Sequence, residues 1–250
     1  MTLKDKVAVV TGGGRGMGRA IANAFAAEGA DVAVIDRVAD NLAAVRDEVE
    51  ARGRRCLTIE ADLTHTAGLP EVFAEVQEEL GGLHILMNNA GVQVEASAVD
   101  TTEEQWDLAM NVNAKALFFC AREAGRYFLA REQRGKIINT CSTLAYIAEP
   151  DFSAYCASKG AVVQITRALA SEWAQHGINV NGISPTIVET DMTQYLLDNP
   201  KYREDYLAKL PARAFPKPED LADAAVFLAG PHSNFVHGHV LAVDSGESAV

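Results

Sequence analysis

The chain has 250 residues, of which 48% are hydrophobic, so it can bury the core of one large domain without disulfide staples. Acidic residues outnumber basic ones by 34 to 22, and the formal net charge of −12 argues against nucleic acid as a partner. The apolar run at 7–10 is too short for a signal-peptide core. The chain contains no run of about 18 apolar residues, the length that would predict a membrane span, so we expect no membrane partner.

Short β-branched runs alternate with amphipathic stretches along the whole chain, which predicts β–α repeats around a parallel sheet. We expect strands at 6–11, 31–36, 56–60, 85–87, 136–140, 179–183 and 240–243, and helices at 20–28, 40–52, 68–80, 103–130, 153–175 and 218–229. Because the strands are apolar on both faces, helices should cover both sides of the sheet. The predicted fold is α/β: a single doubly wound Rossmann domain over 1–250, with a parallel sheet of about seven strands.

One region, 186–217, departs from this alternation and is bounded by Pro185 and Pro218. We interpret it as a mobile flap beside the carboxyl ends of the strands, where open α/β sheets bind ligands. Aromatic side chains there could line a substrate pocket or simply hold the flap packed, and the sequence leaves both readings open. The candidates are Phe152, Tyr195, Leu196, Tyr202 and Tyr206.

A glycine-rich loop joins the first predicted strand to the first predicted helix and reads Thr-Gly-Gly-Gly-Arg-Gly-Met-Gly over 11–18. The missing side chains let backbone N–H groups and the positive helix end approach a pyrophosphate. Such a turn can also serve only to connect a strand to a helix. As a dinucleotide site, the loop predicts cofactor contacts from Gly12, Arg15, Gly16, Met17 and Gly18.

Asp36 ends the second predicted strand, at the separation from the loop that suits a carboxylate accepting the ribose hydroxyls of a dinucleotide. Such a carboxylate repels a 2′-phosphate, so we expect NAD as the cofactor rather than NADP. Arg15 and Arg37 oppose this choice, because each could pair with a phosphate. The alternative is that both arginines are solvated surface residues.

Tyr155 and Lys159 lie four residues apart on a predicted helix, so their side chains share one face. An ammonium beside a phenol stabilises the phenolate and should lower the pKa of Tyr155 toward a range useful for proton transfer. Ser142 follows a predicted strand, and its hydroxyl should emerge at the ligand-binding end of the sheet, where it could orient a substrate oxygen. Its ordinary alternative is to cap its own backbone.

Together these motifs resemble the landmarks of the short-chain dehydrogenase/reductase family, in order and over nearly the whole chain. They are the loop pattern Thr-Gly-x-x-x-Gly-x-Gly, Asn88-Asn89-Ala90-Gly91, Ser142, Tyr155-Cys156-Ala157-Ser158-Lys159 and the segment 181–192. The resemblance implies a catalytic set of Asn113, Ser142, Tyr155 and Lys159, with Asn113 supporting a proton-relay water and Lys159 also holding the nicotinamide ribose. It further implies cofactor contacts from Asp62, Leu63, Asn89, Gly91, Tyr155, Lys159, Pro185, Val188 and Thr190.

The implied activity is hydride transfer between a nicotinamide cofactor and a secondary alcohol or ketone. The sequence looks similar to the branch of gluconate 5-dehydrogenases and other polyol or sugar-acid dehydrogenases, and cyclic alcohols also fit. An NADP-dependent carbonyl reductase and a catalytically silent nucleotide-sensing protein of the same fold stay open as alternatives. Two departures from the family pattern, Thr186 and Ser245 where glycine is usual, leave the details of the substrate pocket in doubt.

The expected partner is a small-molecule substrate. The six histidines and four cysteines show no convincing metal-ligand spacing, so we expect no metal, and unpaired cysteines fit a cytoplasmic location. Apolar side chains on the predicted helices exceed a single buried stripe, among them Phe118, Phe119 and Trp173. We therefore expect a homo-oligomer, and the family resemblance suggests a homotetramer.

Overall fold

Seven parallel strands form one sheet in a computed structural model that describes residues 1–250. They are β1 (Val7–Thr11), β2 (Asp31–Asp36), β3 (Cys56–Glu60), β4 (Ile85–Asn88), β5 (Gly135–Thr140), β6 (Ile178–Pro185) and β7 (Val240–Val243). Their order across the sheet is β3-β2-β1-β4-β5-β6-β7, so the direction of winding reverses between β1 and β4. Sheets of this kind bind their ligands beyond the carboxyl ends of the strands at that reversal.

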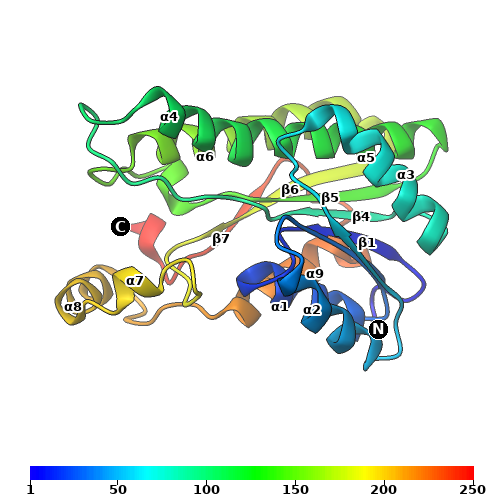
Figure 1. Cartoon of the computed structure of the whole chain (residues 1–250), viewed down its shortest axis with the longest axis horizontal. Helices are drawn as coiled ribbons and strands as arrows, with labels where there is room; N and C mark the ends of the chain where they lie inside the picture. The colour runs from blue at the N-terminus through cyan, green and yellow to red at the C-terminus, as the bar shows by residue number, and fades with distance from the viewer.

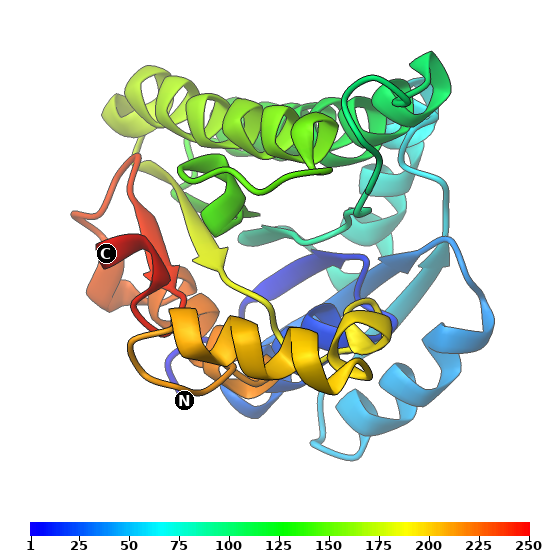
Figure 2. The ribbon, with the colours of Figure 1, turned by 90° about the vertical axis from the view of Figure 1, so that its left-hand side faces the viewer.

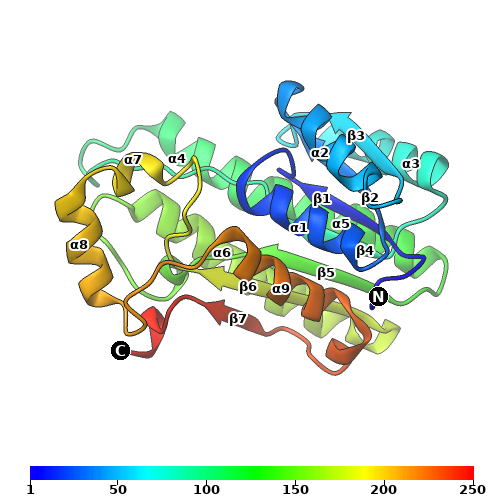
Figure 3. The ribbon, with the colours of Figure 1, turned by 90° about the horizontal axis from the view of Figure 1, so that it is seen from below.

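Helices cover both faces of the sheet (Figures 1 and 3). One face carries α3 (Leu69–Leu80), α4 (Glu103–Met110), α5 (Leu117–Ala130) and α6 (Ser153–Trp173), and the other carries α1 (Gly16–Ala27), α2 (Asp40–Glu50) and α9 (Pro218–Ala229). None of these helices combines the length and the apolar character that crossing a membrane requires. The doubly wound α/β fold predicted from the sequence is confirmed.

Strand β1 shows why its first four residues, Val7 to Val10, are all apolar. Successive side chains of a strand point to opposite faces of the sheet. Val7 and Val9 accordingly belong to the core beneath α3, α5 and α6, whereas Ala8 and Val10 belong to the core beneath α1, α2 and α9. Two buried layers therefore fix the sheet from both sides and hold the ends of its strands in place.

The segment 186–217, which departs from the β–α alternation, includes short helices that the sequence did not predict. It contains α7 (Gln194–Leu197) and α8 (Pro200–Lys209), which lie beyond the carboxyl ends of the strands (Figure 2). The side chain of Asn199 accepts hydrogen bonds from the backbone N–H groups of Lys201 and Tyr202, which caps α8. A small apolar cluster of its own anchors this segment: Leu197, Tyr206, Leu210 and Phe215.

The helix expected over 103–130 is interrupted. A π-helical segment, Asn111–Ala116, separates α4 from α5. The buried side chain of Asn113 leaves this segment to bond Val92 and Ser158, contacts that a regular hydrophobic periodicity does not reveal. Single π-helical turns of this kind are frequent at functional sites. The remaining boundaries match within a few residues, apart from α1, which begins at Gly16 rather than at 20.

Candidate active site

The glycine-rich loop passes from β1 into α1 with no room for a side chain at Gly12 or Gly18. Gly12 has a φ of +60°, and a Cβ there would lie 2.8 Å from the Cα of Ala90. A Cβ on Gly18 would collide with the carbonyl oxygen of Gly12, so this glycine lets α1 approach the loop closely. The loop is thereby held tightly between the ends of β1 and β4, with the amino end of α1 behind it.

The carboxylate of Asp36 at the end of β2 organises this loop. Its Oδ2 accepts the backbone N–H of Gly14 at 3.0 Å, and its Oδ1 accepts the backbone N–H of Val38 at 3.1 Å. Asp36 lines the cleft above the loop, together with the two arginines that the sequence sets against it, Arg15 and Arg37. Both arginines are exposed and form no ion pair. The cleft therefore carries a carboxylate suited to ribose hydroxyls and two cations suited to phosphate.

Asn89, directly after β4, joins the two halves of the sheet. Its Nδ2 donates to the carbonyls of Thr11 and Gly12, at 3.2 and 3.0 Å. The hydroxyl of Thr11 in turn accepts the backbone N–H groups of Asn89 and Ala90. The Oδ1 atom of Asn89 is buried and has no partner, although the residue lines the cleft. An orphaned acceptor beside a glycine cradle fits a ligand that brings its own donors, as a dinucleotide does.

The cleft has a volume of about 620 Å³ and collects most of the cofactor residues predicted from the sequence. Its lining includes Gly12, Arg15, Gly16, Met17, Asp36, Arg37, Asp62, Leu63, Asn89, Gly91 and Thr190. Gly18 is the exception, because it packs against the loop and lines neither this cleft nor the pocket beside it. The prediction missed the apolar walls, Ile35, Ala61, Val112 and Ala116, whose side chains look like ordinary core in the sequence.

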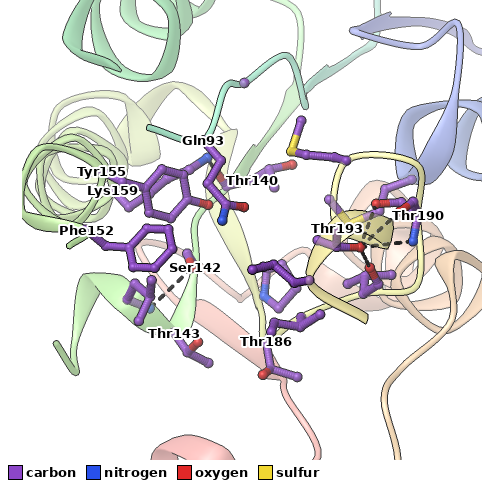
Figure 4. Close-up of a pocket in the computed structure, with 18 of the residues that line it drawn as sticks. Gln93, Thr140, Ser142, Thr143, Phe152, Tyr155, Lys159, Thr186, Thr190 and Thr193 are labelled. Carbon is purple, nitrogen blue, oxygen red and sulfur yellow. Dashed lines mark hydrogen bonds between the residues drawn. The ribbon is translucent and has the colours of Figure 1, made fainter. Parts of the chain in front are cut away.

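A second pocket opens from the same cleft and contains the proposed proton-transfer groups. Tyr155 and Lys159 lie on successive turns of α6, and Ser142 follows β5 (Figure 4). In the figure they lie across the pocket from the segment that carries Thr190 and Thr193. The pocket shares seven lining residues with the cleft, so the two form one continuous site: Met17, Asn89, Gly91, Val92, Gln93, Thr190 and Met192.

The surroundings of Tyr155 and Lys159 disfavour charge on both. Burial raises the pKa of the Tyr155 phenol to about 12, and the hydroxyl of Ser142 offsets only part of that rise. Burial lowers the pKa of Lys159 to about 8. The Lys159 ammonium lies 5.7 Å from the centroid of the Tyr155 ring and donates to the carbonyl of Thr140 at 2.9 Å. The expectation that Lys159 lowers the pKa of Tyr155 is therefore wrong: burial of the phenol raises that pKa, and the hydroxyl of Ser142, not the ammonium of Lys159, offsets part of the rise.

Ser142 combines its two expected roles. Its Oγ accepts the backbone N–H of Leu144 at 3.2 Å and so caps the turn that follows β5. The same hydroxyl still has its hydrogen to donate, and Ser142 lines the pocket. A serine fixed in this way can present an O–H donor to a substrate oxygen without first losing rotamer freedom.

Asn113, which the resemblance implies as the support of a proton-relay water, lines neither the pocket nor the cleft. Its Oδ1 accepts the N–H of Val92 at 2.8 Å, and its Nδ2 donates to the carbonyl of Val92 and to the hydroxyl of Ser158. The side chain is fully buried and its polar atoms are all engaged. Ser158 precedes Lys159 directly, so Asn113 is placed to hold α6 against the loop after β4.

The other end of the pocket is formed by the chain that leaves β6. Pro185, Val188 and Thr190, for which the resemblance implies contacts to the nicotinamide, line it. Thr186 does not adopt a positive φ, so its backbone needs no glycine, and its hydroxyl lies 3.5 Å from that of Tyr206. Ser245 does adopt a φ of +57°, and a hydrogen bond from its Oγ to the carbonyl of Ala214 compensates for that conformation.

The sequence reasoning missed five polar residues of this pocket: Gln93, Thr140, Thr143, Glu149 and Thr193. Thr140 could have been found, because it ends β5 at the ligand-binding edge of the sheet. Gln93 and Glu149 lie in irregular segments, where no periodicity indicates which way a side chain points.

A glycine cradle at the winding reversal, continuous with a pocket that holds a tyrosine, a lysine and a serine, is typical of one class of protein: dinucleotide-dependent oxidoreductases.

Comparison with known proteins agrees. A sequence profile described as enoyl-(acyl carrier protein) reductase matches residues 12–248. The chain is 38% identical to 2-dehydro-3-deoxy-D-gluconate 5-dehydrogenase of Escherichia coli, over 98% of this chain and 96% of that one. It is also 38% identical to an NAD-dependent glycerol dehydrogenase of Listeria innocua, over 98% and 94% of the two chains. A crystal structure from Agrobacterium tumefaciens, described as a 2-deoxy-D-gluconate 3-dehydrogenase with bound NADP, superposes with a TM-score of 0.94 at 35% identity, covering 100% and 98%.

The chain therefore belongs to the short-chain dehydrogenase/reductase family. It is an oxidoreductase that uses a nicotinamide cofactor to act on CH–OH groups.

Proposed function

We propose that this enzyme interconverts a secondary alcohol and a ketone on a small polyhydroxylated substrate, with Tyr155 as the proton-transferring residue. The observation that carries this proposal is the continuity of the Tyr155 pocket with the dinucleotide cleft through seven shared lining residues. A substrate held in the pocket lies next to a cofactor held in the cleft, which hydride transfer requires.

The proposed roles follow from the contacts of each side chain. A bound nicotinamide dinucleotide would supply the group that accepts or donates the hydride. Tyr155, with its pKa raised by burial, holds the proton that passes to or from the substrate oxygen. Ser142 donates its hydroxyl hydrogen to that oxygen, and Lys159 fixes the end of β5 against α6 through Thr140 and, by family resemblance, holds the nicotinamide ribose. Asn113 acts as a positioning residue behind them.

The names of the relatives support small hydroxylated substrates, since one is named for a sugar acid and another for glycerol. The test is a panel of polyols, sugar acids and cyclic alcohols, each supplied with NAD and with NADP, followed by the absorbance of the reduced nicotinamide. We expect turnover of at least one open-chain polyhydroxylated compound. Tight dinucleotide binding with no turnover across the panel would instead support a nucleotide-sensing protein, and a marked preference for simple ketones with NADPH would support a carbonyl reductase.

For the cofactor, the position of Asp36 favours NAD, whereas the NADP-bound relative and the two unpaired arginines support NADP as well. Asp36→Asn is expected to raise the ratio of kcat/KM for NADP to that for NAD roughly tenfold or more, because it removes a charge that repels the 2′-phosphate. The amide oxygen can still accept the N–H of Gly14, so the loop should keep its shape. Steady-state kinetics with both cofactors measure the ratio.

Asp40→Asn is the matched control for this substitution. Asp40 is exposed at the start of α2 and does not line the cleft. The substitution Asp40→Asn removes the same charge as Asp36→Asn, four residues further along the chain. In Asp40→Asn the ratio of kcat/KM for NADP to that for NAD should equal the ratio of the unsubstituted enzyme. Equal ratios for Asp36→Asn and Asp40→Asn would contradict the role assigned to Asp36.

The assembly and the location of the enzyme belong to the same proposal. Trp106, Phe118 and Leu129 on α4 and α5 expose apolar surface that association would cover, which supports a homo-oligomer, and the family resemblance suggests a homotetramer. Light scattering on the purified protein would test this, and a clean monomer would contradict it. A cytoplasmic enzyme of one Rossmann domain, with α7 and α8 as a substrate flap, is consistent with four unpaired cysteines and with use of the cellular dinucleotide pool.

A further inference from the structure

Glu149 is a carboxylate in the substrate pocket with no partner of its own. It lies in the loop before α6 and lines the pocket together with Ser142, Phe152, Tyr155 and Tyr202. Its side chain is only partly exposed and takes part in no hydrogen bond or ion pair. A half-buried carboxylate in this position lacks donors and would gain from a ligand that supplies them.

The cations near the site are distributed unequally. Arg15 and Arg37 line the dinucleotide cleft, where the anionic pyrophosphate is expected. The only cation that lines the substrate pocket is Lys159, and its ammonium already donates to the carbonyl of Thr140 at the reaction end. A substrate carboxylate in this pocket would therefore meet the anion of Glu149 without a free cation to offset it.

Further acidic groups surround this part of the pocket. Burial raises the pKa of Glu149; next, the charge of Lys209 lowers it, and the charges of Glu247 and Glu95 raise it by less. The phenol of Tyr202 has its pKa raised by burial and next by Glu149, which indicates that the two side chains are close. Lys209 is exposed, does not line the pocket and lies over the ring of Tyr206, with 5.3 Å from its Nζ to the ring centroid. Three charged groups outside the pocket lining, two acidic and one basic, therefore act on Glu149.

We propose that Glu149 is a specificity-determining residue that selects uncharged polyols and excludes sugar acids. It accepts hydrogen bonds from substrate hydroxyls and repels a substrate carboxylate. This inference rests on the proposed function and narrows its substrate class, and it separates this chain from its relatives that are named for gluconate derivatives.

The size of the effect can be estimated from the charges. Two like charges about 6 Å apart at an effective dielectric constant of about 20 correspond to roughly a hundredfold difference in affinity. Because Glu149 is partly exposed, solvent screens the repulsion, and we expect roughly a tenfold effect. The alternative is that Glu149 is a solvated residue at the rim, with Lys209 reaching in to bind a carboxylate.

Three ligands that differ only at C1 provide the test: D-glucitol with a hydroxymethyl group, D-gluconate with a carboxylate and 1-amino-1-deoxy-D-glucitol with an ammonium. Calorimetric titration into enzyme saturated with NADH measures their binding, and kcat/KM is measured for each one that turns over. The unsubstituted enzyme should bind glucitol with an affinity roughly tenfold or more above that for gluconate. Failure to bind glucitol, or gluconate binding as tightly, would overturn the inference. Because this readout is binding, absence of turnover across the whole panel would contradict the proposed function separately.

Glu149→Gln keeps the shape of the side chain and removes its charge. It should increase the affinity for gluconate roughly tenfold, lower the affinity for the amino compound and change the affinity for glucitol by less than about threefold. Glu95→Gln is the matched control, because Glu95 is exposed, lies outside the pocket lining and accepts the hydroxyl of Tyr195 at 2.9 Å. An equal change in gluconate affinity in the two variants would show that the effect comes from general surface charge, and it would overturn the assignment. Loss of gluconate binding in Lys209→Met, with glucitol unchanged, would do the same by showing that Lys209 captures the carboxylate.

Discussion

Tyr155→Phe is expected to lower kcat by roughly a thousandfold while changing the dissociation constant for NADH by less than about twofold. The substitution removes only the hydroxyl that holds the transferable proton. The ring stays in place, because it packs edge-on against Phe152 with centroids 6.4 Å apart. Turnover with a substrate from the panel gives kcat, and quenching or enhancement of NADH fluorescence on titration gives the dissociation constant.

The same substitution at Tyr146 is the control. Tyr146 is 49% exposed and lines neither the pocket nor the cleft, so Tyr146→Phe should leave kcat and NADH binding unchanged. Both variants should unfold within a few degrees of the parent, which separates loss of chemistry from loss of fold. Turnover near that of the parent in Tyr155→Phe would refute the catalytic assignment, whatever the substrate proves to be.

The sheet and most of the cofactor cleft could be predicted because their signals are local. Strand β1 is apolar from Val7 to Val10 because each of these side chains enters one of two cores, and the glycines after the strand mark the turn into α1. Asp36 and Ser142 each follow a strand, and parallel strands bring their carboxyl ends to one edge of the sheet. Position along the chain therefore sufficed to bring these residues to one site.

Other features depend on contacts between distant segments and could not be read in this way. The π-helical segment accompanies the bonds of Asn113 to Val92, which lies 21 residues away in an irregular loop. The direction of the Tyr155 pKa shift depends on how far the pocket excludes water, which spacing on a helix does not report. Glu149 likewise enters the pocket from a loop without periodicity, so its carboxylate became visible only in three dimensions.

Lys159→Met should abolish most activity and make the protein more stable. The low pKa of Lys159, about 8, means that the fold disfavours its charged form by about 3 kcal/mol relative to water. Leaving the carbonyl of Thr140 without its donor costs about 1 kcal/mol, so the net gain is about 2 kcal/mol, or roughly 4 °C in Tm. Activity should fall roughly a hundredfold or more, since the residue anchors the site. Calorimetric unfolding at neutral pH and steady-state kinetics measure the two effects.

The pH dependence of this gain has a definite sign. Below pH 8 the lysine is charged in both folded and unfolded states, so the full cost of its burial weighs on the parent protein. Between pH 8 and 10.5 the folded state releases the proton that the unfolded state still holds, so the parent gains stability and the advantage of the variant shrinks. Lys136→Met is the matched control, because burial lowers the pKa of Lys136 to about 8 as well, but its ammonium donates to Ser233 and Asn234 away from the site. It should keep full activity. A Lys159→Met protein less stable than the parent at neutral pH would show that the ammonium supports the fold, and the account of a site that sacrifices stability for chemistry would then be wrong.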